Sequence, residues 1–469
     1  MTTDLDYLTI AEGAARIRSR DLSPVDWTQH LITRIEALNP SLHAFVQVTA
    51  EHALDQAGKA GAEIAAGNYR GPLHGVPFAL KDIYDTAGIA TTGQSKVCAG
   101  RVPERDAATV RRLKDAGAVL LGKLTTHEFA YGGPSFDLPG PPARNPWDTD
   151  RFTGGSSSGS GAAVASGMVP ATMGSCTGGS IRTPAAYCGI AGLKPTAGLV
   201  SRAGVLPLSY TLDTCGPMAW TVEDCALMLQ ALAGYDPEDG QSVERPIPDY
   251  RAALTGDIKG LRIGVVRHFW EVDKTTDPAV AAALDAAIGV LGGLGAEVED
   301  VTLSPLDDFA VSQWIIACAE ANAIHDDTLR HRPNDYGENF RYRILPGAVL
   351  GAVDYVQALR QRRELIHEVE TVLKDFDILF TATTPILPPL MADEDLVSIL
   401  ASRGITGAFN ITGGPALALC CGFTDDGLPL SMTLGGKAFD DAMVMRVGHA
   451  YEGATEWRRR RPNLKGDGP

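Results

Sequence analysis

Hydrophobic residues form two different patterns along the chain, namely helical spacing and short, continuous apolar runs. In residues 5–68, apolar side chains recur at helical spacing, which predicts amphipathic helices. Ser23 before Pro24 is a typical helix start, and Pro40 predicts the end of that helix. Short, continuous apolar runs further along indicate buried strands. These runs are 76–80, 118–121, 261–266 and 378–381, and residues 298–301 are interpreted as another strand.

Segments with a helical pattern lie between the predicted strands. Strands that alternate with helices are typical of an α/β fold, in which helices cover both faces of the sheet. The length of 469 residues allows one large domain or two to three ordinary ones, and no internal repeat divides the chain. The predicted helices are 107–117, 162–169, 277–294, 307–331 and 352–374.

Composition and charge narrow the range of functions. With 45% hydrophobic and 21% charged residues, the chain has a normal globular balance, and no apolar run is long enough to cross a membrane. Met1 to Tyr7 are acidic rather than a basic, apolar export signal, which predicts a cytoplasmic location. The net charge of −16 argues against nucleic acid as a partner, because binding to phosphates needs a basic face.

Cysteine and histidine spacing gives no support for a metal site or another cofactor. The eight cysteines are scattered, apart from one adjacent pair, which suits reduced thiols in the cytosol. His127-Glu128 lacks a second histidine four residues further on, as a zinc-binding helix would require. We therefore expect neither a metal nor an organic cofactor.

Two glycine- and serine-rich stretches are the strongest chemical signals. Residues 154–161 read GGSSSGSG and residues 177–182 read TGGSIR. A flexible linker is one interpretation of the first stretch. However, the compact apolar segment 162–169 follows at once, and a linker does not need it. Such loops let backbone N–H groups approach a ligand and bind anions or developing oxyanions.

Three chemistries could use these loops. A phosphate-binding loop would need a lysine that neither stretch contains. An α/β-hydrolase elbow fits residues 155–159 with Ser157 as nucleophile, and His449 and Asp440 could complete its triad. That elbow must follow a strand directly, whereas the preceding residues 139–150 do not form one. The third chemistry is a serine activated by a lysine of lowered pKa.

Several blocks of the chain resemble the amidase signature family. The two serine-rich stretches are similar to the signature itself, and Gly178-Gly179-Ser180 lies at its centre. The resemblance covers nearly the whole chain and is least recognisable in 305–370. The similar blocks are 73–82, 122–123, 127–133, 144–147, 154–160, 174–182, 184–185, 189–196, 409–416 and 422–429.

The resemblance implies a fold and a division of the chain. It implies a single α/β domain over 1–469, an α/β/α sandwich with a large, mixed, twisted sheet. Within it we expect an N-terminal helical segment (1–70) and a signature and catalytic core (71–260). Helices of a variable substrate pocket (305–370) and a segment that completes the core (371–465) follow.

The resemblance also implies a Ser-cisSer-Lys triad without a catalytic histidine. Lys81 matches the base, Ser156 the serine that follows a cis peptide bond, and Ser180 the nucleophile. A lysine base predicts an alkaline activity profile whose acidic limb lies above the histidine range. The backbone N–H groups expected to form the oxyanion hole belong to Thr177, Gly178, Gly179 and Ser180.

Other residues are expected to bind the substrate or support the site. Ala130 and Tyr131 match a loop beside the substrate, and Ser157 and Arg182 are expected to play supporting roles. Cys176 departs from the family pattern, where an aspartate pairs with the arginine that matches Arg182. A neutral thiol cannot supply that charge, so Arg182 is expected to find another acid or water. A second interpretation makes Cys176 itself the nucleophile.

The function predicted from these residues is that of a stand-alone amidohydrolase. It would cleave small apolar or aromatic amides through an acyl-serine intermediate. Alternatives are a carbamate or aryl ester hydrolase, a catalytically silent binding protein and a subunit of an amidotransferase. The expected partners are a small-molecule substrate and at most a second copy of the chain, with neither nucleic acid nor membrane. The pocket is expected to be lined by aromatics of 305–370, namely Trp314, Tyr336, Phe340, Tyr342 and Tyr355.

Overall fold

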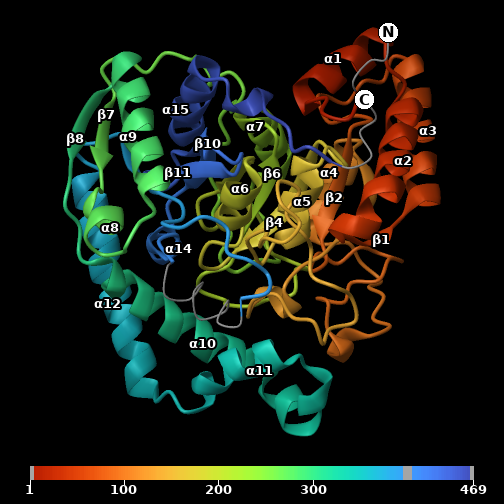
Figure 1. Ribbon diagram of the computed structural model, residues 1–469. Helices are drawn as coiled ribbons and strands as arrows, with labels where there is room; N and C mark the ends of the chain where they lie inside the picture. The colour runs from red at the N-terminus through yellow and green to blue at the C-terminus, as the bar shows by residue number, and fades with distance from the viewer. Residues whose placement is uncertain (1–4, 394–403, 465–469) are drawn as a thin grey trace.

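One large mixed β-sheet organises the computed structural model, which describes residues 5–393 and 404–464 (Figure 1). Over these described residues, eleven strands run in the order β1-β3-β2-β4-β6-β5-β10-β11-β9-β7-β8. The strands are β1 (Phe45–Val48), β2 (Pro77–Lys81), β3 (Val119–Leu124), β4 (Ala171–Cys176), β5 (Ala191–Lys194), β6 (Thr214–Ala219), β7 (Arg262–Val265), β8 (Glu297–Asp300), β9 (Ile378–Ala382), β10 (Ala416–Phe423) and β11 (Pro429–Gly436).

Helices cover the sheet, as the α/β prediction requires. Every residue of β2, β3, β4, β5, β6, β9 and β11 is buried, so both faces of the central sheet are covered. The α/β/α sandwich with a mixed sheet is thus confirmed. The helices are α1 (Ile10–Ser19), α2 (Pro24–Leu42), α3 (Ala50–Ala65), α4 (Ala108–Asp115), α5 (Ser158–Ala165), α6 (Arg182–Cys188), α7 (Val222–Leu232), α8 (His268–Glu271), α9 (Pro278–Gly293), α10 (Leu306–His331), α11 (Glu338–Ile344), α12 (Ala352–Val372), α14 (Gly407–Thr412) and α15 (Asp441–Ala454).

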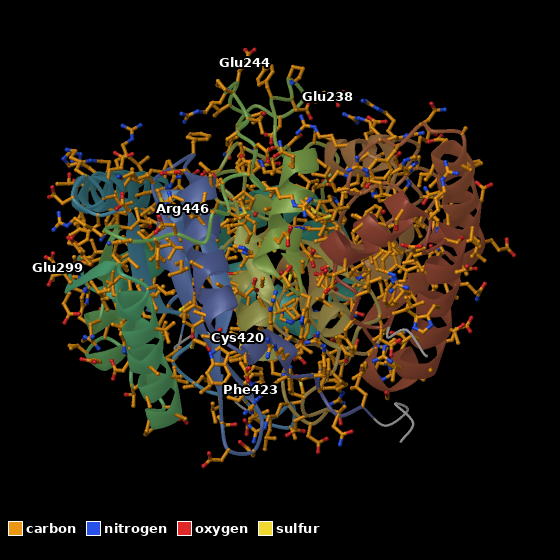
Figure 2. The ribbon with its side chains drawn as sticks, turned by 90° about the horizontal axis from the view of Figure 1, so that it is seen from above. Glu238, Glu244, Glu299, Cys420, Phe423 and Arg446 are labelled. Carbon is orange, nitrogen blue, oxygen red and sulfur yellow. The ribbon has the colours of Figure 1, made fainter. Side chains whose placement is uncertain are left out.

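The order of strands sets the long axis of the molecule. Figure 1 shows α1, α2 and α3 at the end near β1, and β7, β8 and α9 at the opposite end. Seen from above in Figure 2, Glu299 of β8 lies at one rim, whereas Cys420 of β10 lies nearer the middle. In the described residues, no helix combines the length and apolarity needed to cross a membrane.

Two central parallel strands bring the predicted chemistry together. β2 and β4 pair in parallel, with Ala79 opposite Thr172 and Leu80 opposite Met173. Lys81 ends β2, and the TGGSIR stretch begins directly after β4. Because parallel strands end at the same edge of a sheet, the predicted base and the predicted nucleophile loop start side by side.

The five predicted strands are confirmed as β2, β3, β7, β8 and β9, but the prediction of an all-helical 5–68 is wrong. Phe45–Val48 forms β1, an edge strand that pairs with β3. α2 begins after Ser23, whose side chain accepts a hydrogen bond from the Val25 N–H, as predicted. It does not end at Pro40 but continues to Leu42, because in the last turn the missing N–H of proline costs only one hydrogen bond.

Besides β1, five further strands of the sheet were not predicted from the sequence pattern. β4, β5, β6, β10 and β11 lie in the centre of the sheet or next to it. β4 contains Thr172, Gly174 and Ser175 rather than a continuous apolar run. Small and hydroxyl side chains are acceptable there because neighbouring strands and helices exclude water, a property that local periodicity does not reveal. The chain's acidic start includes residues 1–4, which lie outside the described residues.

Candidate functional site

The predicted site residues meet around one cavity of about 210 Å³. It lies where the loop after β4 approaches the serine stretch at Gly155 and Ser156 and the segments around residues 127–133 and 404–406. Lys81 does not line the cavity but is fully buried behind Ser156. The predicted residues that line it are Ala130, Tyr131, Ser156, Thr177, Gly178, Gly179 and Ser180.

Lys81 is held between two serine hydroxyls. Its Nζ lies 2.7 Å from the Ser156 Oγ and 2.9 Å from the Ser175 Oγ. Burial lowers the pKa of Lys81 to about 7, although the nearby Cys176 and Asp213 act to raise it. A substantial fraction of this lysine is therefore neutral near pH 7, as a base requires.

The two serine loops are connected to each other. The Gly155-Ser156 peptide bond is cis, as the resemblance implies. The Ser157 N–H donates to the Ser180 carbonyl at 3.2 Å. Ser180 is half-buried at the cavity, and the residue that caps α6 is Ile181, without a side-chain hydrogen bond. The Ser180 hydroxyl is therefore not used as a helix cap.

The loop 177–180 is braced from two sides. The Thr177 Oγ1 donates to the Asp213 Oδ1 at 2.5 Å, and the Thr406 Oγ1 donates to the Gly178 carbonyl at 2.6 Å. Gly179 has a φ of +140°, and a Cβ there would lie 2.0 Å from the Thr406 Oγ1, so only glycine fits. Within the described residues, the N–H groups of 178–180 donate no hydrogen bond and remain available to an oxyanion.

Arg182 and Cys176 lie beneath this loop. The fully buried Arg182 donates through Nη2 to the Asn410 Oδ1 at 2.6 Å and lies 3.6 Å from the Cys176 Sγ. Among the described residues, its Nε and Nη1 have no hydrogen-bond partner. Of the two expected partners, an acid is not found beside Arg182 among the described residues, and the amide of Asn410 takes that place. Burial acts to raise the pKa of Cys176, but Arg182 and the Ile181 N–H hold it below its usual value.

Cys176→Asp is expected to keep most of the activity and to unfold at a temperature no lower than the parent chain. A carboxylate at this position would lie against the guanidinium of Arg182, whose Nη2 is 3.6 Å from the Cys176 Sγ. Cys176→Ala is expected to retain substantial activity as well, because the thiol is not the predicted nucleophile. Thermal unfolding and turnover are the measurements.

Cys188→Asp is the matched control for this substitution. Cys188 is equally buried, but burial raises its pKa and, among the described residues, no cation compensates. An aspartate there should destabilise the chain by several kcal/mol. Equal destabilisation at both positions would contradict the role assigned to Arg182, and an inactive Cys176→Ala chain would favour a thiol nucleophile.

The elbow triad with Ser157 does not assemble. The Ser157 Oγ donates to the Ser175 carbonyl at 3.3 Å and accepts from the Ser175 N–H, so it supports β4 rather than the cavity. Asp440 caps α15 by accepting from the Met443 N–H. Neither it nor His449 lines the cavity.

The predicted aromatic lining from 305–370 is wrong. Tyr336 and Phe340 stack on each other, with ring centroids 5.3 Å apart, in the hydrophobic core. Trp314 and Tyr342 are exposed, and the Tyr355 hydroxyl donates to Glu320. The helices turn these rings towards the core or solvent, and a count of aromatics does not reveal which helix face meets the cavity. From this range, Gln313 and Arg343 line it.

Two lining residues were missed from the sequence. Arg343, on α11, donates through Nη1 to the Gly132 carbonyl at 2.8 Å and lies over the Tyr131 ring. His127 lies beside Ser156. Of the described lining residues, Arg343 alone belongs to the Lys, Arg, Asp and Glu types. Its segment was the least recognisable part of the chain, so no motif marked it.

The chain belongs to the amidase signature family, because the family model described as Amidase matches residues 26–445. It is accordingly an amidase-family enzyme that acts on carbon–nitrogen bonds.

Particular relatives define the similarity more closely. The chain is 40% identical to a glutamyl-tRNA(Gln) amidotransferase subunit of Chloroflexus aggregans, over 98% of this chain and 99% of the relative. It is similar to a solved structure of a vestigial protein complex linked to an s-triazine catabolic enzyme, with 34% identity, a TM-score of 0.90 and coverage of 97% and 100%. It is also similar to the peptide amidase of Stenotrophomonas maltophilia, with 30% identity, a TM-score of 0.84 and coverage of 97% and 98%.

These relatives overturn two predictions. A stand-alone amidohydrolase of apolar amides is wrong, because the chain matches amidotransferase subunits along almost its whole length. The restriction of partners to small molecules or a second copy is wrong too, because such relatives are named as parts of a larger enzyme and their name includes tRNA. Net charge describes one chain, whereas a complex can hold a nucleic acid on another subunit. The net charge of −16 on this chain therefore does not exclude nucleic acid as a partner of the complex.

Proposed function

We propose that the chain is the amide-donor subunit of an amidotransferase that acts on a tRNA-linked substrate. It breaks the carbon–nitrogen bond of a carboxamide and releases ammonia for use by a partner subunit. The similarity to glutamyl-tRNA(Gln) amidotransferase subunits supports the proposal of a partner subunit and of a tRNA-linked acceptor for the ammonia. The observation that carries the donor chemistry is the cavity that combines Ser180, the buried Lys81 and the single Arg343.

The proposed chemistry begins with neutral Lys81. It accepts a proton from Ser156, which accepts one from Ser180, and Ser180 attacks the carboxamide carbon. The N–H groups of loop 177–180 stabilise the oxyanion, at about 3 kcal/mol of barrier for each effective donor. The leaving nitrogen receives a proton through Ser156, ammonia departs, and water then releases the acyl group as a carboxylic acid.

Arg343 is proposed to select donors that carry a carboxylate. Its Nη1 donates to the Gly132 carbonyl, and the guanidinium also interacts with Tyr131, so it is held in place at the cavity, where it can meet a ligand. A planar guanidinium binds a carboxylate through two parallel hydrogen bonds. Glutamine and asparagine are carboxamides that carry such a group.

Arg343→Gln is expected to raise KM for glutamine at least about tenfold. It should leave turnover of the uncharged propionamide nearly unchanged, because that donor has no carboxylate for Arg343 to bind. Ammonia release measures both. Arg341→Gln, on the same helix but outside the cavity, is the control. An equal effect of Arg343→Gln on both donors would argue against carboxylate recognition.

The amidotransferase proposal itself is tested by reconstitution. Ammonia release from glutamine is measured for the chain alone, and then with the other amidotransferase subunits of the same organism and glutamylated tRNA. We expect slow release alone, strong stimulation in the complex and transfer of the amide to the tRNA-linked glutamate. Full activity alone, with no stimulation and no transfer, would refute it.

Three of the sequence-based predictions remain parts of this proposal. The division of the single domain into 1–70, 71–260, 305–370 and 371–465 stays a prediction, and its last segment includes residues outside the described ranges. The cytoplasmic location is likewise a prediction, in keeping with a tRNA-linked acceptor. The catalytic roles of Lys81, Ser156 and Ser180 are tested by the substitutions described below.

A further inference from the structure

His127 is a buried side chain in the cavity that the proposed chemistry does not use. It lines the cavity and is only 7% exposed. Across the described residues, its ring has no hydrogen-bond partner, and its Nε2 is fully enclosed. A buried, unpaired polar group costs about 1–3 kcal/mol. The enclosed Nε2 cannot reach a ligand, so an interaction with a bound substrate falls to the other ring nitrogen.

The ring is fixed against the Ser156 loop. The His127 N–H donates to the Ser156 carbonyl at 3.1 Å, and the ring stacks on Phe152 with centroids 5.8 Å apart. A Cβ on Gly155 would lie 2.0 Å from the His127 Cε1, so this ring position requires glycine there. Since Nε2 is enclosed against Gly155, Nδ1 is the nitrogen left open to a ligand.

The charge state of His127 limits what it can do. Burial lowers its pKa to about 3, and the nearby Lys81 and Arg343 act in the same direction. The imidazole is therefore neutral near pH 7 and keeps one unprotonated nitrogen. A group with this pKa does not serve as a general acid or base there. It can accept a hydrogen bond without titrating.

We propose that His127 binds the departing nitrogen of the carboxamide by accepting a hydrogen bond from one of its N–H groups. This inference rests on the proposed carbon–nitrogen cleavage. The leaving nitrogen must lie near the Ser156 hydroxyl, its proton source, and His127 is anchored to that same residue. When the C–N bond breaks, its electron pair stays on nitrogen, which takes the Ser156 proton and leaves as ammonia. His127 accepts a hydrogen bond from an N–H of the leaving nitrogen throughout, and it neither gains nor loses a proton.

An ester of the same acyl group separates this role from a structural one. Its leaving oxygen carries no hydrogen to donate, whereas both donors form the same acyl-enzyme. L-Glutamine and the γ-methyl ester of L-glutamate are such a pair. His127→Phe, which keeps a ring but removes the acceptor, should lower kcat/KM for the amide about tenfold or more. It should change the ester much less, and His127→Gln, which restores an acceptor, should recover part of the loss.

A binding comparison gives a readout that does not depend on turnover. In a Ser180→Ala background, calorimetry should show tighter binding of the amide than of the ester, and His127→Phe should remove the difference. Acetamide and methyl acetate have no carboxylate for Arg343 to bind, so they provide the same amide–ester comparison independently of that residue. Loss of partner-stimulated ammonia release would refute the amidotransferase proposal but leave this comparison intact. Equal losses on amide and ester, no loss on either, or equal binding of both would overturn the role of His127.

Discussion

Ser180→Ala is expected to abolish acyl-enzyme formation and to lower turnover by at least about a thousandfold. The substitution removes the proposed nucleophile and keeps the fold, because Ser180 is half-buried and does not cap α6. A fluorophosphonate probe should label Ser180 in the parent chain, as located by mass spectrometry. The Ser180→Ala chain should remain unlabelled while its thermal unfolding is unchanged.

Ser157→Ala is the matched control for the nucleophile. Ser157 lies in the same serine-rich stretch as Ser156, but its hydroxyl supports β4. Its loss should cost about 1 kcal/mol of folding free energy and leave the labelling of Ser180 intact. A fluorophosphonate adduct on Ser157 would restore the elbow mechanism and contradict the lysine-based one.

The second large effect is expected at Lys81. The base works only when neutral, and burial lowers its pKa from 10.5 to about 7. Activity should therefore fall as the pH drops below about 7 and level off above it. The sequence predicted a limb above the histidine range, and burial moves it down. Lys81→Ala should lower turnover by at least about a thousandfold, and the acidic limb of the pH profile should disappear.

Two controls separate Lys81 from its neighbours in the pH profile. Burial also raises the pKa of Glu128 to about 7, and this residue lies in the segment beside the cavity. Glu128→Gln should keep the limb if Lys81 is the titrating group. His127→Gln should keep it as well, because the pKa of His127 is about 3. A limb that persists in Lys81→Ala but disappears in Glu128→Gln would assign the titration to the glutamate.

The sequence predicted those parts of the fold whose physics is local. Helices α9, α10 and α12 and strands β2, β3, β7 and β9 follow from periodicity and continuous apolar runs. β4 does not, because its small and hydroxyl residues are stabilised by neighbours far away in the chain. Edge strand β1 was hidden inside a helical region, since four residues between two helices leave too short a pattern.

The site residues likewise fall into those that the sequence predicted and those that only the tertiary fold reveals. Lys81, Ser156 and Ser180 were found because their loops have a recognisable composition. Arg343 and His127 were not assigned to the cavity, since only the tertiary fold brings α11 and the 127–133 segment to it. Whether the enzyme works alone or within a complex depends on its partners, and neither motif spacing nor net charge reports that.

The cavity is assembled from segments that lie far apart along the chain. Lys81 ends β2, Ser180 follows β4, and the brace on Gly178 comes from Thr406, 228 residues further along. No contiguous stretch can form this site alone, because contacts of such large separation appear only once the sheet is complete. Reactivity towards a serine-directed probe therefore serves as a sensor of global folding, and it distinguishes intact molecules from those that are merely compact.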